Sequence, residues 1–389
     1  MTLTSLNRMN ETTRAIRIPH MARLCVLGVS LALGLSACGS SKLKPAPLES
    51  LSSSARIAPA WSVRVGNAAP TFALSTTDEA VTVASTDGNI VSLDIRSGRE
   101  RWRAQARTEL SAAVGSDGRY AAVVAASNEL MVFDQGKLLW SERQPGRVLT
   151  APVVAGERVF VEAVDRSVRA YDALDGRYLW VYQRPGTEPL ALATRSVIEP
   201  FRDTLLVGQG NRLVGLDPLK GTPRFDVSVG TPRGTNEVER LADLIGPLAR
   251  VDDEACVRAF QFSVACLELN RGSVRWSRPQ AGTQAVAANL QMVVGADGTD
   301  RLSAWKSDNG DALWRIDRFA NRGLSAPAFW GERIAVADAD GYLHILAQAD
   351  GRTLARAELD APLAGAPKVV GGTLLLVTRR GTVYAFRGN

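Results

Sequence analysis

The sequence holds few residues that could carry out acid–base, nucleophilic or metal chemistry. It contains two histidines, and His20 falls in an N-terminal segment typical of a targeting signal. That leaves His344, which lies in the middle of a predicted strand, where a packing or cross-strand role is favoured. A Ser/His/Asp arrangement or a metal-ligand cluster cannot be assembled around one histidine. The residues therefore favour a non-enzymatic protein with no catalytic, cofactor or metal site.

Four cysteines divide between the N-terminus and one predicted hairpin. Cys256 and Cys266 flank a turn near Gln261, and their places in the repeat predict that they face each other across two antiparallel strands. Facing cysteines in an oxidising compartment are within reach of a disulfide, which we expect here. The alternative is a pair of small core thiols. Their spacing is not that of a metal site.

The first 37 residues have the features of a secretory signal peptide rather than of a folded element. A basic region ends at Arg23, and the apolar stretch 24–35 that follows is short for a membrane span. The tetrapeptide Leu35-Ser36-Ala37-Cys38 resembles the lipobox of bacterial lipoproteins, in which the cysteine is lipidated and becomes the first residue. An ordinary signal peptide or a short anchor is the alternative. The initiating methionine is Met1, Met9 or Met21.

Lipidation of Cys38 predicts a protein tethered to a membrane by its acyl chains. Gly39 stands where an Asp would retain a lipoprotein in the inner membrane, so the resemblance implies the periplasmic face of the outer membrane. Residues 38–60 are rich in Ser, Pro and Ala and predict a flexible tether. The signal carries half of the formal charge of +6, and no dense Lys/Arg run follows it, which argues against nucleic-acid binding.

One phrase recurs through the rest of the chain: an alternating apolar strand, an acidic residue, a turn that ends in Gly and, four residues later, a Trp. Its clearest copy is 170–180, in which Gly176 precedes Trp180, and the seventh copy has Ala355 in the Trp position. The turn glycines stand at positions 98, 136, 176, 221, 272, 310 and 351. A period near 40 residues built from short strands is typical of a propeller blade. The sequence therefore predicts an all-β, eight-bladed propeller of four-stranded antiparallel blades over residues 61–389.

The eighth copy of the phrase stops before its outer strand, because the chain ends at Asn389. A spare strand of the right type, Trp61 to Val65, precedes the first copy. We expect this N-terminal strand to complete the eighth blade and close the ring, which leaves no open gap between the first and last blades. The Trp of each phrase supplies a large flat ring for the gap between neighbouring blades.

Two consecutive crossings from an outer strand to the next inner strand are longer than the others. Trp140 to Pro152 is 12 residues, whereas Trp180 to Pro200 is 20 and Phe225 to Pro247 is 22. Because these crossings emerge on the same face of a propeller, we expect 182–199 and 230–246 to lie side by side on one rim. Long loops on a rigid scaffold are the usual site of function, and a tolerated insertion is the alternative.

The composition of the two crossings suits a contact with another protein. Residues 189–195 place leucines and an arginine in a segment that need not be core, and residues 235–244 predict a short helix capped by Thr235. Apolar anchors within a charged rim are typical of protein–protein interfaces. The candidate protein-binding residues are Leu190, Leu192, Thr194, Arg195, Glu237, Glu239, Arg240 and Asp243.

The repeated phrase resembles that of quinoprotein propellers. Together with the lipobox, Asp340-Gly341-Tyr342-Leu343-His344 and the motif 237–243, it resembles the BamB family, lipoproteins of the outer-membrane β-barrel assembly machinery. The resemblance implies a scaffold that docks on a POTRA domain of the barrel subunit through the two long crossings. Leu192 and Arg195 match the first docking loop by position and Asp243 matches the second, while Thr194 and Ile245 depart from the family's usual Leu and Asp. Unfolded outer-membrane proteins are a further possible partner.

The rival interpretation is a periplasmic quinone-dependent dehydrogenase, since those enzymes share the repeated phrase. Such an enzyme needs a deep polar site for the quinone and Ca²⁺, usually with adjacent cysteines. Cys256 and Cys266 are ten residues apart, and the sequence shows no matching Lys/Asp/Glu constellation. We therefore expect no cofactor.

Overall fold

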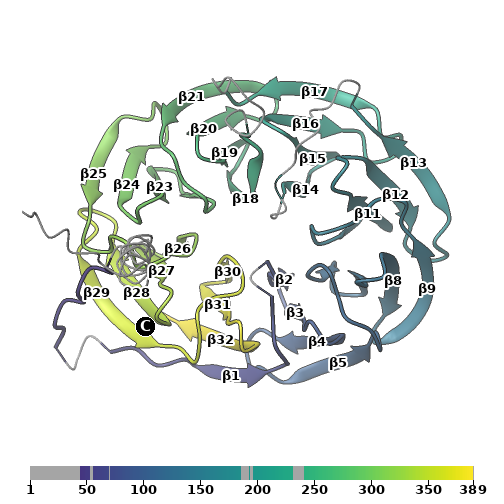
Figure 1. The fold of residues 1–389 in the computed structure, drawn as a ribbon, viewed down its shortest axis with the longest axis horizontal. Helices are drawn as coiled ribbons and strands as arrows, with labels where there is room; N and C mark the ends of the chain where they lie inside the picture. The colour runs from purple at the N-terminus through teal and green to yellow at the C-terminus, as the bar shows by residue number, and fades with distance from the viewer. Residues whose placement is uncertain are drawn as a thin grey trace, which may run out of the picture. The chain divides into compact units, whose positions relative to one another are not determined.

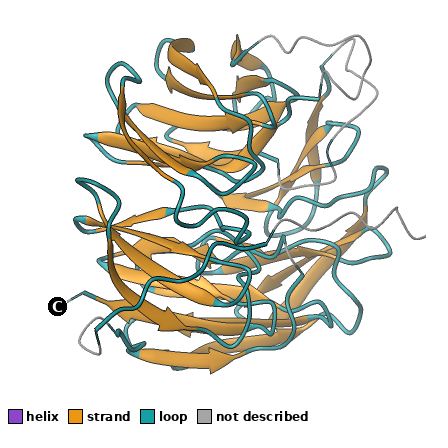
Figure 2. Ribbon diagram, turned by 60° about the vertical axis from the view of Figure 1, so that its left-hand side comes forward, coloured by secondary structure: helices purple, strands orange, loops and turns teal. Residues whose placement is uncertain are grey.

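The structure is a computed structural model, and it describes residues 44–52, 56–69, 71–184, 192, 196–230 and 241–388. Residues from Pro45 onward form one compact unit. Its regular elements are strands, arranged in four-stranded sheets around a ring (Figures 1 and 2). No helix long and apolar enough to cross a membrane occurs in this part of the chain.

Eight sheets form the blades of the ring, and in each the chain runs from the innermost strand outward (Figure 1). Blades one to four consist of β2 (Ser75–Thr76), β3 (Ala80–Ala84), β4 (Asn89–Asp94) and β5 (Glu100–Gln105); β6 (Gly115–Ser116), β7 (Tyr120–Val124), β8 (Glu129–Asp134) and β9 (Lys137–Arg143); β10 (Val153–Ala155), β11 (Arg158–Glu162), β12 (Val168–Asp172) and β13 (Tyr178–Tyr182); β14 (Ile198–Phe201), β15 (Thr204–Gln209), β16 (Arg212–Leu216) and β17 (Pro223–Ser228).

The remaining blades follow the same order, except that the last takes its outer strand from the other end of the chain. Blades five to eight consist of β18 (Leu244–Val251), β19 (Glu254–Ala259), β20 (Ser263–Glu268) and β21 (Ser273–Pro279); β22 (Ala287–Ala288), β23 (Met292–Ala296), β24 (Leu302–Lys306) and β25 (Ala312–Ile316); β26 (Ala328–Trp330), β27 (Arg333–Ala337), β28 (Tyr342–Ala347) and β29 (Thr353–Glu358); β30 (Lys368–Val370), β31 (Thr373–Val377), β32 (Thr382–Arg387) and β1 (Trp61–Arg64). The predicted eight-bladed fold is confirmed.

The ring closes through antiparallel pairing of β1 with β32. Trp61 lies opposite Ala385, and Arg64 lies opposite Thr382. The second strand of each blade is buried on both faces, as in β3 and β31, because neighbouring blades cover the two sides of every sheet. The expected closure by the N-terminal strand is confirmed, so the first and last blades meet without an unpaired strand between them.

At most seams between blades, an aromatic ring from one outer strand packs on the turn Gly of the next blade; Gly136, which lies nearest to the Arg103 backbone, is the exception. The Trp140 Nε1 donates a hydrogen bond of 2.9 Å to the Ala173 carbonyl, and its indole covers Gly176. Gly176 has φ +75°, and a Cβ there would lie 2.6 Å from the indole, so only glycine fits both the turn and the ring. This packing explains Ala355: the next blade takes its outer strand from the N-terminus and has no such turn to receive a Trp.

Part of the segment predicted as a flexible tether makes contacts with the ring. Residues 45–52, which we call the N-terminal strap, lie against blade seven. The Ala46 N–H donates to the Ala320 carbonyl at 2.9 Å, and the Ala46 carbonyl accepts from Arg322 Nη1 at 2.8 Å. Glu49 forms an ion pair of 3.2 Å with Arg318. The partners lie about 270 positions along the chain, so composition alone could not reveal them.

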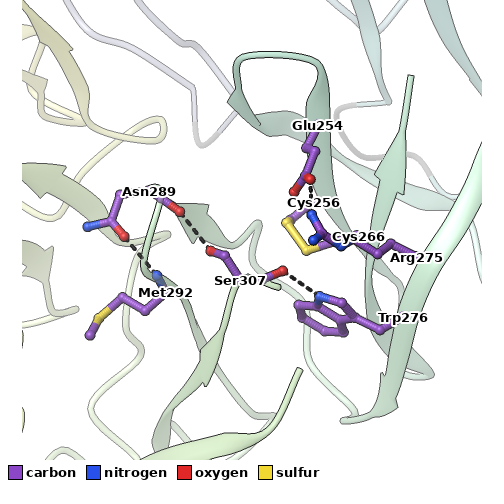
Figure 3. Close-up of a disulfide and its surroundings, with 8 residues drawn as sticks. All are labelled: Glu254, Cys256, Cys266, Arg275, Trp276, Asn289, Met292 and Ser307. Carbon is purple, nitrogen blue, oxygen red and sulfur yellow. Dashed lines mark hydrogen bonds and ion pairs between the residues drawn. A yellow bond between two sulfur atoms is a disulfide. The ribbon is translucent and has the colours of Figure 1, made fainter. Parts of the chain in front are cut away.

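Cys256 in β19 and Cys266 in β20 lie directly opposite each other in the ladder and form a disulfide (Figure 3). Both residues are buried, and Trp276 of β21 lies opposite Cys266 on the other side. The sulfurs therefore join two strands in the core shared by blades five and six. Their facing positions are those that the repeat predicts.

Replacing Cys256 and Cys266 together by alanine should lower the free energy of unfolding by about 2 to 3 kcal/mol. The physical reason is that the crosslink, which spans ten positions, restricts the unfolded chain. Urea denaturation with and without a thiol reductant measures the effect. Reductant should destabilise the unaltered protein by a similar amount and leave the double variant unchanged. Equal stability of the two proteins under oxidising conditions would contradict this role.

Candidate docking site

The two long crossings run between blades three and four and between blades four and five. β13 ends at Tyr182 and β14 begins at Ile198, while β17 ends at Ser228 and β18 begins at Leu244. The crossings are thus residues 183–197 and 229–243, shorter than predicted because their last residues belong to the inner strands. Of the eight candidate residues, the structure describes Leu192 and Asp243. The other candidates, with the predicted short helix, lie outside the described residues: Leu190, Thr194, Arg195, Glu237, Glu239 and Arg240.

Asp243 joins the two crossings. Its Oδ2 accepts a hydrogen bond of 2.7 Å from the backbone N–H of Leu192, 51 positions away. Its Oδ1 accepts one of 2.8 Å from Arg166 Nη2, in the turn between β11 and β12. The side chains of Arg166 and Asp243 are 9% and 16% exposed, so this ion pair is largely shielded from water. One carboxylate therefore fixes the first crossing to the second and both to blade three.

Sequence analysis did not identify Arg166 as a site residue. Arg166 has φ +62°, at the turn position where blades one and seven have Gly88 and Gly341. Its carbonyl accepts a hydrogen bond of 3.1 Å from Gln209 Nε2, and its guanidinium packs beside Gly210 of the next blade. A long basic side chain at a position that favours glycine was the available signal.

A second carboxylate, Glu162, lines the same small cavity as Arg166 and Asp243. It is the last residue of β11 and is 4% exposed. The Ser196 hydroxyl donates to Glu162 Oε1 at 3.3 Å, while Oε2 has no hydrogen-bond partner among the described residues. Burial, opposed by the Ser196 hydrogen bond and reinforced by the charge of Asp243, raises the pKa of Glu162 to about 8. Glu162 is therefore protonated at neutral pH, and the Arg166 charge remains available to Asp243.

Replacing Glu162 by glutamine should remove a pH dependence of stability. The pKa of Glu162 is about 8 in the folded protein and near 4.5 when it is exposed, so the folded state holds the proton more tightly between these values. Stability should fall as pH rises from 5 to 8, by at most about 1.4 kcal/mol per pH unit, and Glu162→Gln should flatten this slope. Urea titrations across this range test it, with exposed Glu157→Gln as the control. Identical slopes for the Glu162 variant and the unaltered protein would contradict the assignment.

His344, the remaining candidate for chemistry, is fully buried in β28 of blade seven. Its Nε2 lies 2.9 Å from Asp338 Oδ2, which also pairs with Arg322 Nε at 2.8 Å. Burial lowers the pKa of His344 more than the Asp338 carboxylate raises it. His344 thus belongs to a polar cluster inside the blade, whose Arg322 holds the N-terminal strap. Among the residues that the structure describes, no group of His, Cys, Asp and Glu side chains is arranged to hold a metal ion.

Comparison with known proteins gives one consistent family. A family model described as outer membrane protein assembly factor BamB matches residues 86–316 and 308–389. The chain is 32% identical to outer membrane protein assembly factor BamB of Burkholderia pseudomallei over 363 residues, which cover 91% of this chain and 95% of the relative. It is 31% identical to the protein of the same name from Bordetella pertussis over 369 residues, which cover 92% and 95%.

Solved structures resemble the ring over most of its length. The crystal structure of BamB from Moraxella catarrhalis has a TM-score of 0.75 at 23% identity and covers 85% of this chain and 99% of its own. Quinohemoprotein alcohol dehydrogenase from Comamonas testosteroni has a TM-score of 0.62 at 14% identity, covering 85% and 76%. At these identities both likenesses show the fold alone, and the ring by itself does not indicate an activity.

Proposed function

This chain belongs to the family of outer membrane protein assembly factor BamB, and we propose that it is a non-catalytic scaffold subunit of that assembly machinery. It acts at the outer membrane, where its relatives are named as assembly factors. The scaffold docks on a POTRA domain of the barrel subunit through the two long crossings. Unfolded outer-membrane proteins are a second class of partner.

The observation that carries the docking proposal is the double hydrogen bond of Asp243. A loop that binds a partner loses less conformational entropy when it is already held in place. Asp243, in the second crossing, accepts a hydrogen bond from the Leu192 N–H and so fixes the backbone of the first crossing at Leu192. This fixed residue lies within the segment 190–195 that supplies the apolar and basic candidates. The sequence of the second crossing adds the acidic residues of 237–243, so the two crossings together supply apolar anchors and both signs of charge.

The lipid anchor is the second part of the proposal. Residues 1–37 are a signal peptide, and Cys38 carries the acyl chains that hold the protein on the periplasmic face of the outer membrane. An oxidising periplasm agrees with the disulfide between Cys256 and Cys266. The scaffold is thereby kept near the barrel subunit, which raises the effective concentration of the docking surface.

Arg195→Glu should reduce co-purification of the barrel subunit from detergent-solubilised membranes at least tenfold, because it reverses one charge of the docking surface. Arg177→Glu is the matched control. Arg177 is 70% exposed and follows the third strand of blade three, so it lies on the face opposite the crossings. Circular dichroism of both variants should match the unaltered protein. Equal recovery of the barrel subunit with both variants would refute docking at this rim.

A further inference from the structure

Blade eight differs from every other blade in its charge. Residues 56–69 and 361–388, which include its four strands, contain no Asp or Glu, whereas all other blades carry both signs. Its cations are Arg56, Arg64, Lys368, Arg379, Arg380 and Arg387. Arg64, Arg379 and Arg380 take part in none of the ion pairs found among the described residues. The positive excess of the ring is therefore concentrated in one sector.

Three of these cations meet at one end of the blade. Arg379 and Arg380 form the turn between β31 and β32, and Arg64 ends β1 opposite Thr382. The chain after Arg64 wraps around this turn: the Val65 N–H donates to the Gly381 carbonyl at 2.9 Å, and the Ala68 N–H donates to the Arg379 carbonyl at 3.0 Å. All three arginines are exposed. We call Arg64, Arg379 and Arg380 the basic tip.

Two carboxylates at this end of the blade accept hydrogen bonds from neutral groups. Asp360, in the crossing that leads into blade eight, accepts a hydrogen bond from the Thr382 hydroxyl. Asp87 of blade one lies beside Gly66 and accepts from the Ser85 hydroxyl and the Asn89 amide. Neither forms an ion pair with the basic tip among the described residues. The tip therefore presents its positive charge to solvent, where it can attract an anionic surface.

The N-terminal strap brings the anchor end of the chain to the same face of the ring. In an antiparallel blade the second and fourth strands end on one face, so the β31–β32 turn and the crossings share it. Ala46 is bonded to Ala320 and Arg322, in the crossing from blade six to blade seven. Cys38 precedes Ala46 by eight residues, a span of at most about 29 Å when extended. Blade eight adjoins blade seven, and the described chain therefore begins one blade away from the basic tip, on the same face.

We propose that the basic tip binds the anionic headgroups of the membrane in which the chain is anchored. That the tip lies next to the membrane rests on the proposed lipid at Cys38. The charge and geometry of the tip do not depend on that lipid. Clustered Lys and Arg beside a lipid anchor add electrostatic attraction to the acyl chains, and the two act together. The strap and the tip then hold the sector of blades seven and eight toward the membrane. Blades three to five, with the docking crossings, lie across the ring from this sector (Figure 1).

The test separates the tip from the lipid. Residues 38–389 with Cys38→Ser carry no acyl chain, and their sedimentation with vesicles reports the protein surface alone. We expect binding to vesicles of phosphatidylethanolamine and phosphatidylglycerol at 3:1, little binding to phosphatidylcholine, and weakening at high salt. Arg64→Glu/Arg379→Glu/Arg380→Glu should weaken binding about 100-fold. Arg64→Lys/Arg379→Lys/Arg380→Lys should bind nearly as well as the unaltered tip, because the charge is kept.

A matched triple variant controls for net charge. Arg177, Arg271 and Arg352 are 67% to 78% exposed and lie on other blades, so Arg177→Glu/Arg271→Glu/Arg352→Glu makes the same change in charge elsewhere. An equal loss of binding in this control, no preference for the anionic vesicles, or no loss in the tip variant would overturn the proposal. Capture of an acidic protein without vesicle binding would do so too, because the tip would then be a protein contact. Membrane partitioning of the full chain with and without Cys38→Ser tests the anchor separately.

Discussion

Replacing Trp61 by alanine should lower the free energy of unfolding by about 3 kcal/mol and loosen the seam between blades eight and one. Trp61 Nε1 donates a hydrogen bond of 2.9 Å to the Ile95 carbonyl, and the indole covers Gly98 in the first blade. The same residue belongs to β1, which pairs with β32 as the outer strand of blade eight. Urea denaturation gives the stability, and hydrogen exchange of the β32 amides reports the opening of the seam.

Trp140→Ala is the control for ring closure. Trp140 makes the same two contacts, with the Ala173 carbonyl and Gly176, at a seam where the chain runs continuously from blade two to blade three. Both variants should lose similar stability. Only Trp61→Ala should accelerate exchange at Val383 and Ala385, because β1 can then leave without unfolding a blade. Unchanged exchange at these amides would show that backbone pairing, and not the indole, holds the ring closed.

The repeat made most of the fold predictable, because each copy combines a strand pattern with a turn that only glycine satisfies. Blade number, the N-terminal closing strand and the facing positions of Cys256 and Cys266 follow from aligning the copies. Ala355 was visible as a departure, but its reason lies in the ring: blade eight lacks the turn that would receive a Trp. A repeat pattern reports contacts between corresponding positions, and it says nothing of contacts that occur once.

The contacts that the sequence did not predict are those that occur in one blade and are not repeated in the others. The N-terminal strap has the composition of a linker, yet it is bonded to Ala320 and Arg322 far along the chain. The length of the two crossings predicted the location of the candidate docking site. Asp243 was identified within it by resemblance to the family. Arg166 and Glu162 belong to blade three. They contribute to the site because β11 ends on the face that carries the crossings. Side chains gathered from neighbouring blades carry no common sequence signal.

Asp243→Asn should destabilise the protein by about 3 kcal/mol and reduce co-purification of the barrel subunit at least tenfold. The substitution removes the charge that pairs with Arg166 in a largely shielded site, and it weakens the acceptor for the Leu192 N–H. Arg166 loses this carboxylate partner, and the first crossing loses its hydrogen bond to the second. Asp226→Asn is the control, because its pairs with Arg184 and Arg212 are about one-third exposed and should cost under about 1 kcal/mol.

A double-mutant cycle separates the ion pair from a general effect on packing. If Arg166 and Asp243 act as a pair, Arg166→Gln combined with Asp243→Asn should cost less stability than the sum of the two single changes, by about 1 to 3 kcal/mol. Simple addition of the two losses would contradict the pairing. Docking should remain weak in the double variant even where stability recovers, because the Leu192 N–H still lacks its carboxylate acceptor. Recovery of docking with stability would instead mean that the ion pair alone positions the rim, without the link between the two crossings.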